Sequence, residues 1–309
     1  MDRIASSSLL RQLLPIAVWL ALAAPAFSQE SPPAAISSEA VAQSADASPQ
    51  LLFGIELRRD RISYHFTNPS SFDTSALVPH FFEQRYIADN LWAEVTLHYL
   101  AHVRWETFVG VTPSVRRTAD DYDTFFDPDG SVVVSGTTGG VLIRSFELSQ
   151  RAELGRAGPI RLFARYRFRL DRSDFELGHK TVSRNGRLVE AMDVTTREMT
   201  SSQTHEILFA AADSRDLGSE WHVSIGGELA PTTLGRLLVQ LPDKYPGQDL
   251  VFIAKVLAGS ARLAVRRRGR WPIELSVEGG HTWYYRSSDW MSRDSIGARF
   301  AVGRSWARP

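Results

Sequence analysis

The sequence contains no cysteine among its 309 residues. This absence excludes a disulfide-stabilised scaffold, a thiolate metal site, a cysteine nucleophile and a lipid-modified N-terminal cysteine. Lysine is nearly absent as well, because only three of the 35 basic residues are lysines. The formal net charge is zero, which argues against a broadly basic, nucleic-acid-binding protein.

Long hydrophobic runs are also missing. The longest apolar stretch, Leu13 to Ala24, is too short for a membrane-spanning helix, which needs about 20 residues. It follows Arg3 and Arg11 and precedes Ala26-Phe27-Ser28, a pattern typical of a secretory signal peptide. We expect residues 1–28 to be cleaved after Ser28. The alternative is an N-terminal anchor.

Residues 29–50 are rich in Ala, Ser, Pro and Gln and lack periodicity. Such a composition predicts a disordered linker. The folded part is therefore expected to comprise residues 51–309.

Beyond the linker, the dominant hydrophobic period is two. In residues 91–99, Leu, Ala, Val, Leu and Tyr alternate with polar side chains, and residues 160–171 repeat the pattern. This alternation is typical of β-strands, and no segment has a helical stripe. We expect about ten strands, near 51–66, 81–99, 103–113, 137–153, 160–172, 199–212, 221–230, 250–265, 272–285 and 294–306.

The connections between these strands alternate between short and long. Short turns are expected at 100–102, 154–159, 213–219 and 266–270. Long polar connections are expected at 67–80, 114–136, 173–198, 231–249 and 286–293.

This layout resembles that of Gram-negative outer-membrane β-barrels, which have tight periplasmic turns and longer extracellular loops. The resemblance implies an all-β, up-and-down antiparallel transmembrane β-barrel in the bacterial outer membrane. The alternative is a soluble periplasmic sandwich or lipocalin-like barrel, because period two does not tell which face is wet.

Some residues do not fit a simple alternation. Arg144 and Lys255 fall on the face expected to contact lipid. The first strand changes parity between Arg58 and Ile62, which suggests a β-bulge.

If the charged face points inward, acidic and basic side chains meet in a narrow bore. We expect Arg–carboxylate pairs to fill it and to satisfy one another. An alternative is a narrow anion-permeable path. The expected lumen network comprises Glu94, Arg104, Glu106, Arg165, Arg167, Arg169, Glu274 and Glu278.

The strand layout also resembles the omptin family of outer-membrane proteases. That family holds an Asp-x-Asp pair on its second extracellular loop, which Asp121 and Asp123 match in position and spacing. The family's second pair, Asp–His on the fourth loop, is not matched, because residues 231–249 contain no histidine. Asp121 and Asp123 are therefore weak catalytic candidates.

We expect a non-enzymatic barrel with a structural or surface-interaction role, with no metal and no cofactor. An omptin-like or lipid-modifying hydrolase is the alternative from another class. The expected partners are outer-membrane lipid, the outer-membrane assembly machinery and an extracellular ligand at loops 67–80 and 114–136. No nucleic-acid partner is expected.

Overall fold

A computed structural model describes residues 49–67, 80–126, 129–240, 242–243, 247, 249–286 and 289–306. The chain divides into two compact units, Met1–Ala47 and Ser48–Pro309, and every described residue belongs to the second. The expected signal peptide, and the expected linker up to residue 48, lie outside the described residues. Within the described part, no helix has the length and apolar character needed to cross a membrane.

The described chain folds into ten antiparallel strands. They are β1 (Gln50–Thr67), β2 (His80–Leu100), β3 (Arg104–Phe126), β4 (Val132–Ala157), β5 (Ile160–Arg184), β6 (Arg187–Leu217), β7 (Trp221–Gln240), β8 (Asp249–Arg267), β9 (Ile273–Arg286) and β10 (Asp289–Ser305).

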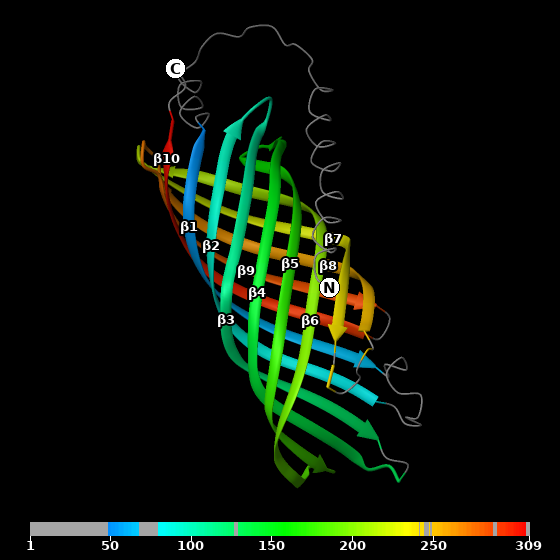
Figure 1. Cartoon of the computed structure of the whole chain (residues 1–309). Helices are drawn as coiled ribbons and strands as arrows, with labels where there is room; N and C mark the ends of the chain where they lie inside the picture. Colours follow the sequence, from blue (N-terminus) through cyan, green and yellow to red (C-terminus); the bar gives the residue numbers. More distant parts are fainter. Residues whose placement is uncertain are drawn as a thin grey trace, which may run out of the picture. The chain divides into compact units, whose positions relative to one another are not determined.

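Each strand pairs with its neighbours in sequence, and β1 pairs with β10, so the sheet closes into a barrel (Figure 1). The closing seam is regular: β1 and β10 remain in register from Gln50↔Ser305 to His65↔Trp290. Closure leaves no unpaired edge around the ring, as a sheet embedded in lipid requires. The expected all-β, up-and-down barrel is confirmed.

The connections at 101–103, 158–159, 218–220 and 268–272 lie at one end of the barrel, hereafter the short-turn end, and the opposite end is hereafter the long-loop end. Most of the expected long connections are wrong at the described residues, because the strands continue through them. β3 runs to Phe126 and β4 starts at Val132, so residues 114–136 are largely strand. β7 likewise continues to Gln240, and β9 and β10 together extend into 286–293. Residues 68–79 lie outside the described chain.

The expected long loop over 173–198 is a hairpin between β5 and β6 that turns at Asn185-Gly186. Both turn residues have positive φ angles, 47° and 78°. Two consecutive positive φ values match the twist of a two-residue hairpin, and Asn-Gly is the pair best suited to it. The hairpin is visible as the green extension of β5 and β6 in Figure 1.

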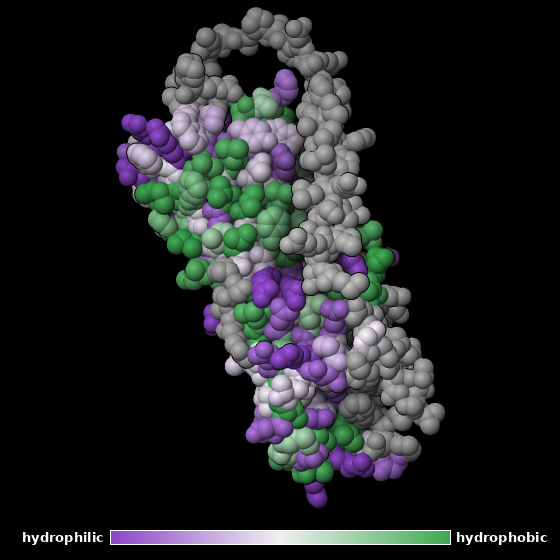
Figure 2. All heavy atoms as spheres, viewed as in Figure 1, coloured by the Kyte–Doolittle hydropathy of each residue, from purple (hydrophilic) through white to green (hydrophobic). Residues whose placement is uncertain are grey.

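The outer wall is apolar toward the short-turn end. On β1, Phe53, Ile55 and Leu57 are exposed, whereas the alternate residue Glu56 is buried. Figure 2 shows this apolar surface gathered over one part of the barrel, with hydrophilic side chains beyond it. Arg144 and Lys255 do lie on this outer face as exposed side chains, Arg144 between Leu142 and Phe146 and Lys255 between Ile253 and Leu257.

The bore changes character along its length. Toward the long-loop end it is filled by a cluster of buried apolar side chains, hereafter the apolar core. Its members are Ile62, Tyr64, Tyr86, Ala88, Ala119, Val141, Ile143, Phe175, Leu177, Leu237, Val239, Ala254, Val256, Tyr284 and Met291.

The apolar core corrects the expected bulge in the first strand. β1 has no register shift against either neighbour. Asp60, Ile62 and Tyr64 all point into the bore and are all buried. The strand keeps its parity, and it is the bore that turns from charged to apolar.

Candidate functional site

The charged section of the bore is built around one row of arginines on β5. Because side chains alternate along a strand, Arg165, Arg167 and Arg169 all point to the same side. The carboxylates that face these arginines, Glu147 and Glu206, are buried, so this side of β5 is the interior of the barrel.

Each of these arginines has a carboxylate partner. Arg165 reaches Glu228 at 2.9 Å and Glu147 at 3.1 Å, contacting β7 and β4 at once. The Nε atom of Arg167 donates to Glu206 at 2.6 Å. Ion pairs of this kind join neighbouring strands or, for Arg165 and Glu228, strands on either side of β6, and they fill the bore with charges of opposite sign.

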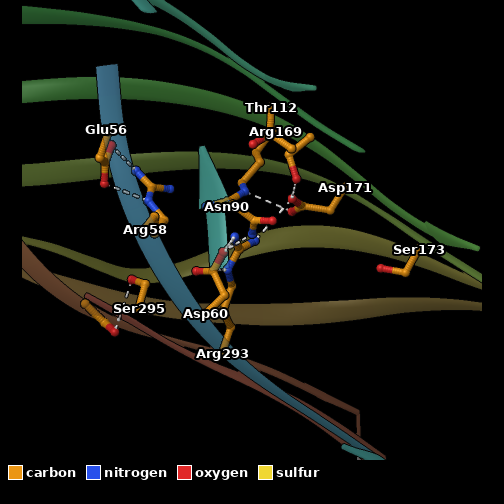
Figure 3. A network of polar contacts seen from close by, with 12 residues as sticks. Glu56, Arg58, Asp60, Asn90, Thr112, Arg169, Asp171, Ser173, Arg293 and Ser295 are labelled. Atoms are coloured by element: carbon orange, nitrogen blue, oxygen red, sulfur yellow. Dashed lines mark hydrogen bonds and ion pairs between the residues drawn. The ribbon is translucent and has the colours of Figure 1, made fainter. Parts of the chain in front are cut away.

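A second group of ion pairs lies where the charged section meets the apolar core. Arg293 on β10 donates to both carboxylate oxygens of Asp60 on β1, at 3.0 Å and 2.6 Å. It also reaches Asp171 on β5 at 3.1 Å, across the bore. Arg169 donates to the same Asp171 at 2.8 Å, and Asn90 donates to Asp60 at 2.9 Å. Figure 3 shows these side chains converging from separate strands.

A third group lies closer to the short-turn end. Arg299 donates to both Glu94 and Glu274, and to Thr96 at 3.2 Å. Arg262 donates to Glu274 at 2.6 Å. The Glu274 carboxylate therefore accepts hydrogen bonds from two guanidinium groups. Through Arg299, these ion pairs link β2 to β9 inside the bore.

Glycines create the space that these side chains occupy. A Cβ atom added at Gly54 would collide with the carboxylate of Glu94, and one added at Gly297 would collide with that of Glu56. Neither glycine has a positive φ angle. The requirement for glycine is therefore steric, set by the charged side chain that lies across its Cα.

Hydroxyl groups line the boundary between the charged section and the apolar core. The Tyr86 hydroxyl lies 2.9 Å from Ser173 Oγ, and Thr200 donates to the Tyr64 hydroxyl at 3.3 Å. All four side chains are buried. These bonds join β2 to β5 and β1 to β6 across the interior at this level.

The structure places five of the eight members of the expected lumen network in the ion pairs described above and three of them apart from these. Glu94, Arg165, Arg167, Arg169 and Glu274 form the ion pairs described above. Arg104 and Glu106 lie at the short-turn end, where their ion-pair distances to Glu153 and Arg151 are 3.8 Å. Glu278 faces Arg262 across the register of β8 and β9.

Several bore residues are absent from that expected list, above all Asp60, Arg293 and Asp171. Arg293 lies on β10 between Met291 and Ser295 on the same face, which gives no run of charged residues to mark it. Asp60 was not assigned to the bore because β1 was expected to change parity between Arg58 and Ile62. Counting by twos from Glu56, without assuming a uniformly polar bore, would have identified Asp60.

Asp121 and Asp123 lie on β3, not on a loop. Asp121 is buried, at 1% exposure, on the inner face toward the long-loop end. Five histidines of the described residues form ion pairs with carboxylates on other parts of the chain: His65 with Glu83, His98 with Glu106, His179 with Asp193, His222 with Asp216 and His281 with Asp294.

The described residues contain no group of three or more His, Asp or Glu side chains placed to hold a metal ion. The chemistry available in the bore is that of guanidinium, carboxylate, hydroxyl and imidazole groups, the last supplied by His98 beside Glu106.

Solved structures with the same architecture identify the fold. The outer membrane protease OmpT from Escherichia coli superposes with a TM-score of 0.60, covering 84% of this chain and 97% of that chain at 6% sequence identity. This chain has the fold of an outer-membrane β-barrel. At this identity the likeness concerns the fold alone.

Other similar structures are the β domain of the Bordetella autotransporter Brka and the translocator domain of the autotransporter NalP from Neisseria meningitidis. Their TM-scores are 0.34 and 0.33, with identities of 11% and 9%. They cover 84% and 86% of this chain, and 100% and 92% of their own. No protein-family model matches the sequence, and neither does any curated protein.

Proposed function

We propose that the chain is an outer-membrane barrel with a sealed bore, which acts as a rigid support for a surface-interaction site rather than as a channel or an enzyme. In this proposal residues 1–28 direct export, and the short-turn end faces the periplasm, as in other barrels of this class.

The observation that carries the proposal is that two successive sections of the bore are both filled with side chains. The charged section is crossed by ion pairs such as Arg293–Asp60 and Arg299–Glu94. The apolar core fills the section beyond it. A solute would have to break the ion pairs and then part a largely apolar cluster, in which the hydroxyls of Tyr86 and Tyr64 are already bonded to Ser173 and Thr200. Ten-stranded barrels are narrow, whereas open aqueous channels have about 16–18 strands.

The long-loop end supports a surface role. β6 pairs with β7 only from Met199 onward, so residues 187–198 extend past the end of β7 with β5 as their ladder partner. Leu188 and Val189 near the tip of this extension are exposed. We place the extracellular ligand site at this end, on the extension and on segments 67–80 and 114–136.

Conductance separates a sealed bore from an open one. The refolded protein is inserted into planar bilayers and liposomes, and ion conductance and swelling with small anions are measured. The proposal expects no channel events and no swelling above that of protein-free liposomes. Steady conductance or anion-driven swelling in the wild-type protein would overturn it in favour of the narrow anion path.

A further inference from the structure

The ion pairs at the short-turn end differ in kind from those in the middle of the bore. Four arginines gather there around two carboxylates, Glu106 and Glu153. We call this set the basic cluster: Arg104, Arg151, Arg156 and Arg161.

All four arginine–carboxylate distances in the basic cluster are long. They are 3.8 Å for Arg104–Glu153, 3.8 Å for Arg151–Glu106, 3.5 Å for Arg156–Glu153 and 3.9 Å for Arg161–Glu153. Mid-bore contacts such as Arg165–Glu228, at 2.9 Å, are direct hydrogen bonds. The ion pairs of the cluster thus lack direct hydrogen bonds, and two carboxylates balance only two of its four formal positive charges.

The strand register adds repulsion between like charges. Arg151 lies directly opposite Arg165, and Arg156 lies directly opposite Arg161. Like charges at directly opposed positions destabilise an antiparallel pair. An anion held between them would relieve this repulsion.

Arg151 has hydrogen-bonding capacity to spare. Its Nε atom is buried and has no hydrogen-bond partner. Its guanidinium lies 3.7 Å from the ring centre of Phe163, and that of Arg161 lies 5.7 Å from the same ring. The two guanidiniums thus flank one aromatic ring, which holds them at the rim of the bore, and the spare donor is that of Arg151.

We propose that the basic cluster is an anion-binding site for a phosphoryl group, open at the short-turn end. Arg151 and Arg161 supply the guanidinium forks, which match phosphate oxygens in bidentate geometry. Phe163 fixes their planes, and Arg104 adds charge. The phosphoryl group belongs either to a free phosphorylated solute or to a lipid headgroup, since both present the same oxygens. This site does not require the bore to conduct.

The test measures binding of inorganic phosphate to the folded protein in a phosphorus-free detergent, by isothermal titration calorimetry. A second arm uses short-chain phosphatidic acid in the same micelles. We expect saturable binding in at least one arm. Binding of inorganic phosphate indicates a solute site, and binding of phosphatidic acid alone indicates a headgroup site.

The variants are Arg151→Gln and Arg161→Gln, with Arg215→Gln as the matched control. Arg215 is at the same rim, is highly exposed and has only a 3.5 Å contact with Asp213. Loss of a charged hydrogen bond should weaken binding about tenfold or more in the first two variants. The control should bind like the wild type. Arg151→Lys, which keeps the charge but not the fork, should bind with intermediate affinity.

Two results would overturn the site: no saturable binding of either probe to the wild type, or equal weakening in Arg151→Gln and Arg215→Gln. Heat-modifiable gel migration of each variant establishes that it is folded. Because conductance is measured separately, an open bore would refute the sealed barrel without refuting this site, and the reverse also holds.

Discussion

Arg293 and Asp60 join the last strand of the barrel to the first. The guanidinium Nε and Nη2 atoms donate to the two carboxylate oxygens at 3.0 Å and 2.6 Å. Both side chains are buried inside the bore, at 3% and 0% exposure. The pair thus reinforces from within the seam that the β1–β10 ladder closes, and through Asp171 it ties that seam to the opposite wall.

Removal of one member of this pair should be strongly destabilising. In Asp60→Asn, Arg293 keeps its charge in a buried position but loses a charged acceptor. Breaking a buried ion pair on one side typically costs about 3–5 kcal/mol. We expect the urea midpoint for unfolding from lipid vesicles to fall accordingly, with little change in its slope.

The double variant Asp60→Asn/Arg293→Gln provides the control for this prediction, because it leaves no buried unpaired charge. Its stability should exceed the value obtained by adding the two single losses. If the two losses simply add, the two residues do not interact across the seam.

The glycines opposite the bore charges lead to a second prediction. In Gly54→Ala the new methyl group must occupy the position of the Glu94 carboxylate, so Glu94 must leave Arg299. The variant should unfold at a lower urea concentration than the wild type. The matched control is Gly259→Ala, where the nearest atom to an added Cβ is 3.6 Å away, an ordinary contact. Equal stability of the two variants would show that the bore repacks freely around Glu94.

The sequence predicts the architecture well because lipid imposes a strict rule on strands. One residue in two must be apolar across the embedded wall, and this yields ten alternating segments with short turns. The rule ends where the lipid ends. Toward the long-loop end the interior becomes an apolar core, so Ile62 and Tyr64 point inward on the same parity as Asp60. Reading polar residues as bore-facing therefore made regular strands look like loops.

The site was predictable only in part for a related reason. Alternation places Arg165, Arg167 and Arg169 on one face of β5, and this alone predicts their shared environment. Which carboxylate each one meets depends on the closure of the ring and on the register of strands far apart in sequence. The Arg293–Asp60 pair spans almost the whole barrel in sequence, and no local pattern links its two members.

The turn between β6 and β7 leads to a pH-dependent prediction outside the membrane-spanning part. The pKa of Asp216 lies below its usual value, because His222 forms a hydrogen bond with its carboxylate and Arg268 adds a second contact. A lowered pKa means that this turn is stabilised above the ordinary pKa of about 3.8. The stabilisation is lost as the pH falls through the lower, folded-state value.

The corresponding measurement follows the carboxyl ¹³C resonance of Asp216 during an acid titration in micelles. In His222→Ala the midpoint should move up, toward the ordinary aspartate value. Arg267→Gln, which removes a neighbouring charge that contacts Glu220 instead, should leave the midpoint in place. An unchanged midpoint in His222→Ala would assign the shift to Arg268.

Charge substitution on the outer wall tests where the membrane lies. Val277 lies on the outer face of β9 between Trp271 and Trp283, and all three are exposed. If lipid covers this wall, Val277→Arg places a charge near the middle of the bilayer and should destabilise the barrel by about 2–4 kcal/mol. Leu188→Arg, on the extension at the long-loop end, should change stability by less than about 0.5 kcal/mol because it remains in water. Comparable losses at both positions would mean that Val277 does not face lipid and that the apolar wall is covered by protein. The unfolding free energies are measured in lipid vesicles. A detergent micelle adapts its shape to the protein surface and would mask the difference in bilayer depth between Val277 and Leu188.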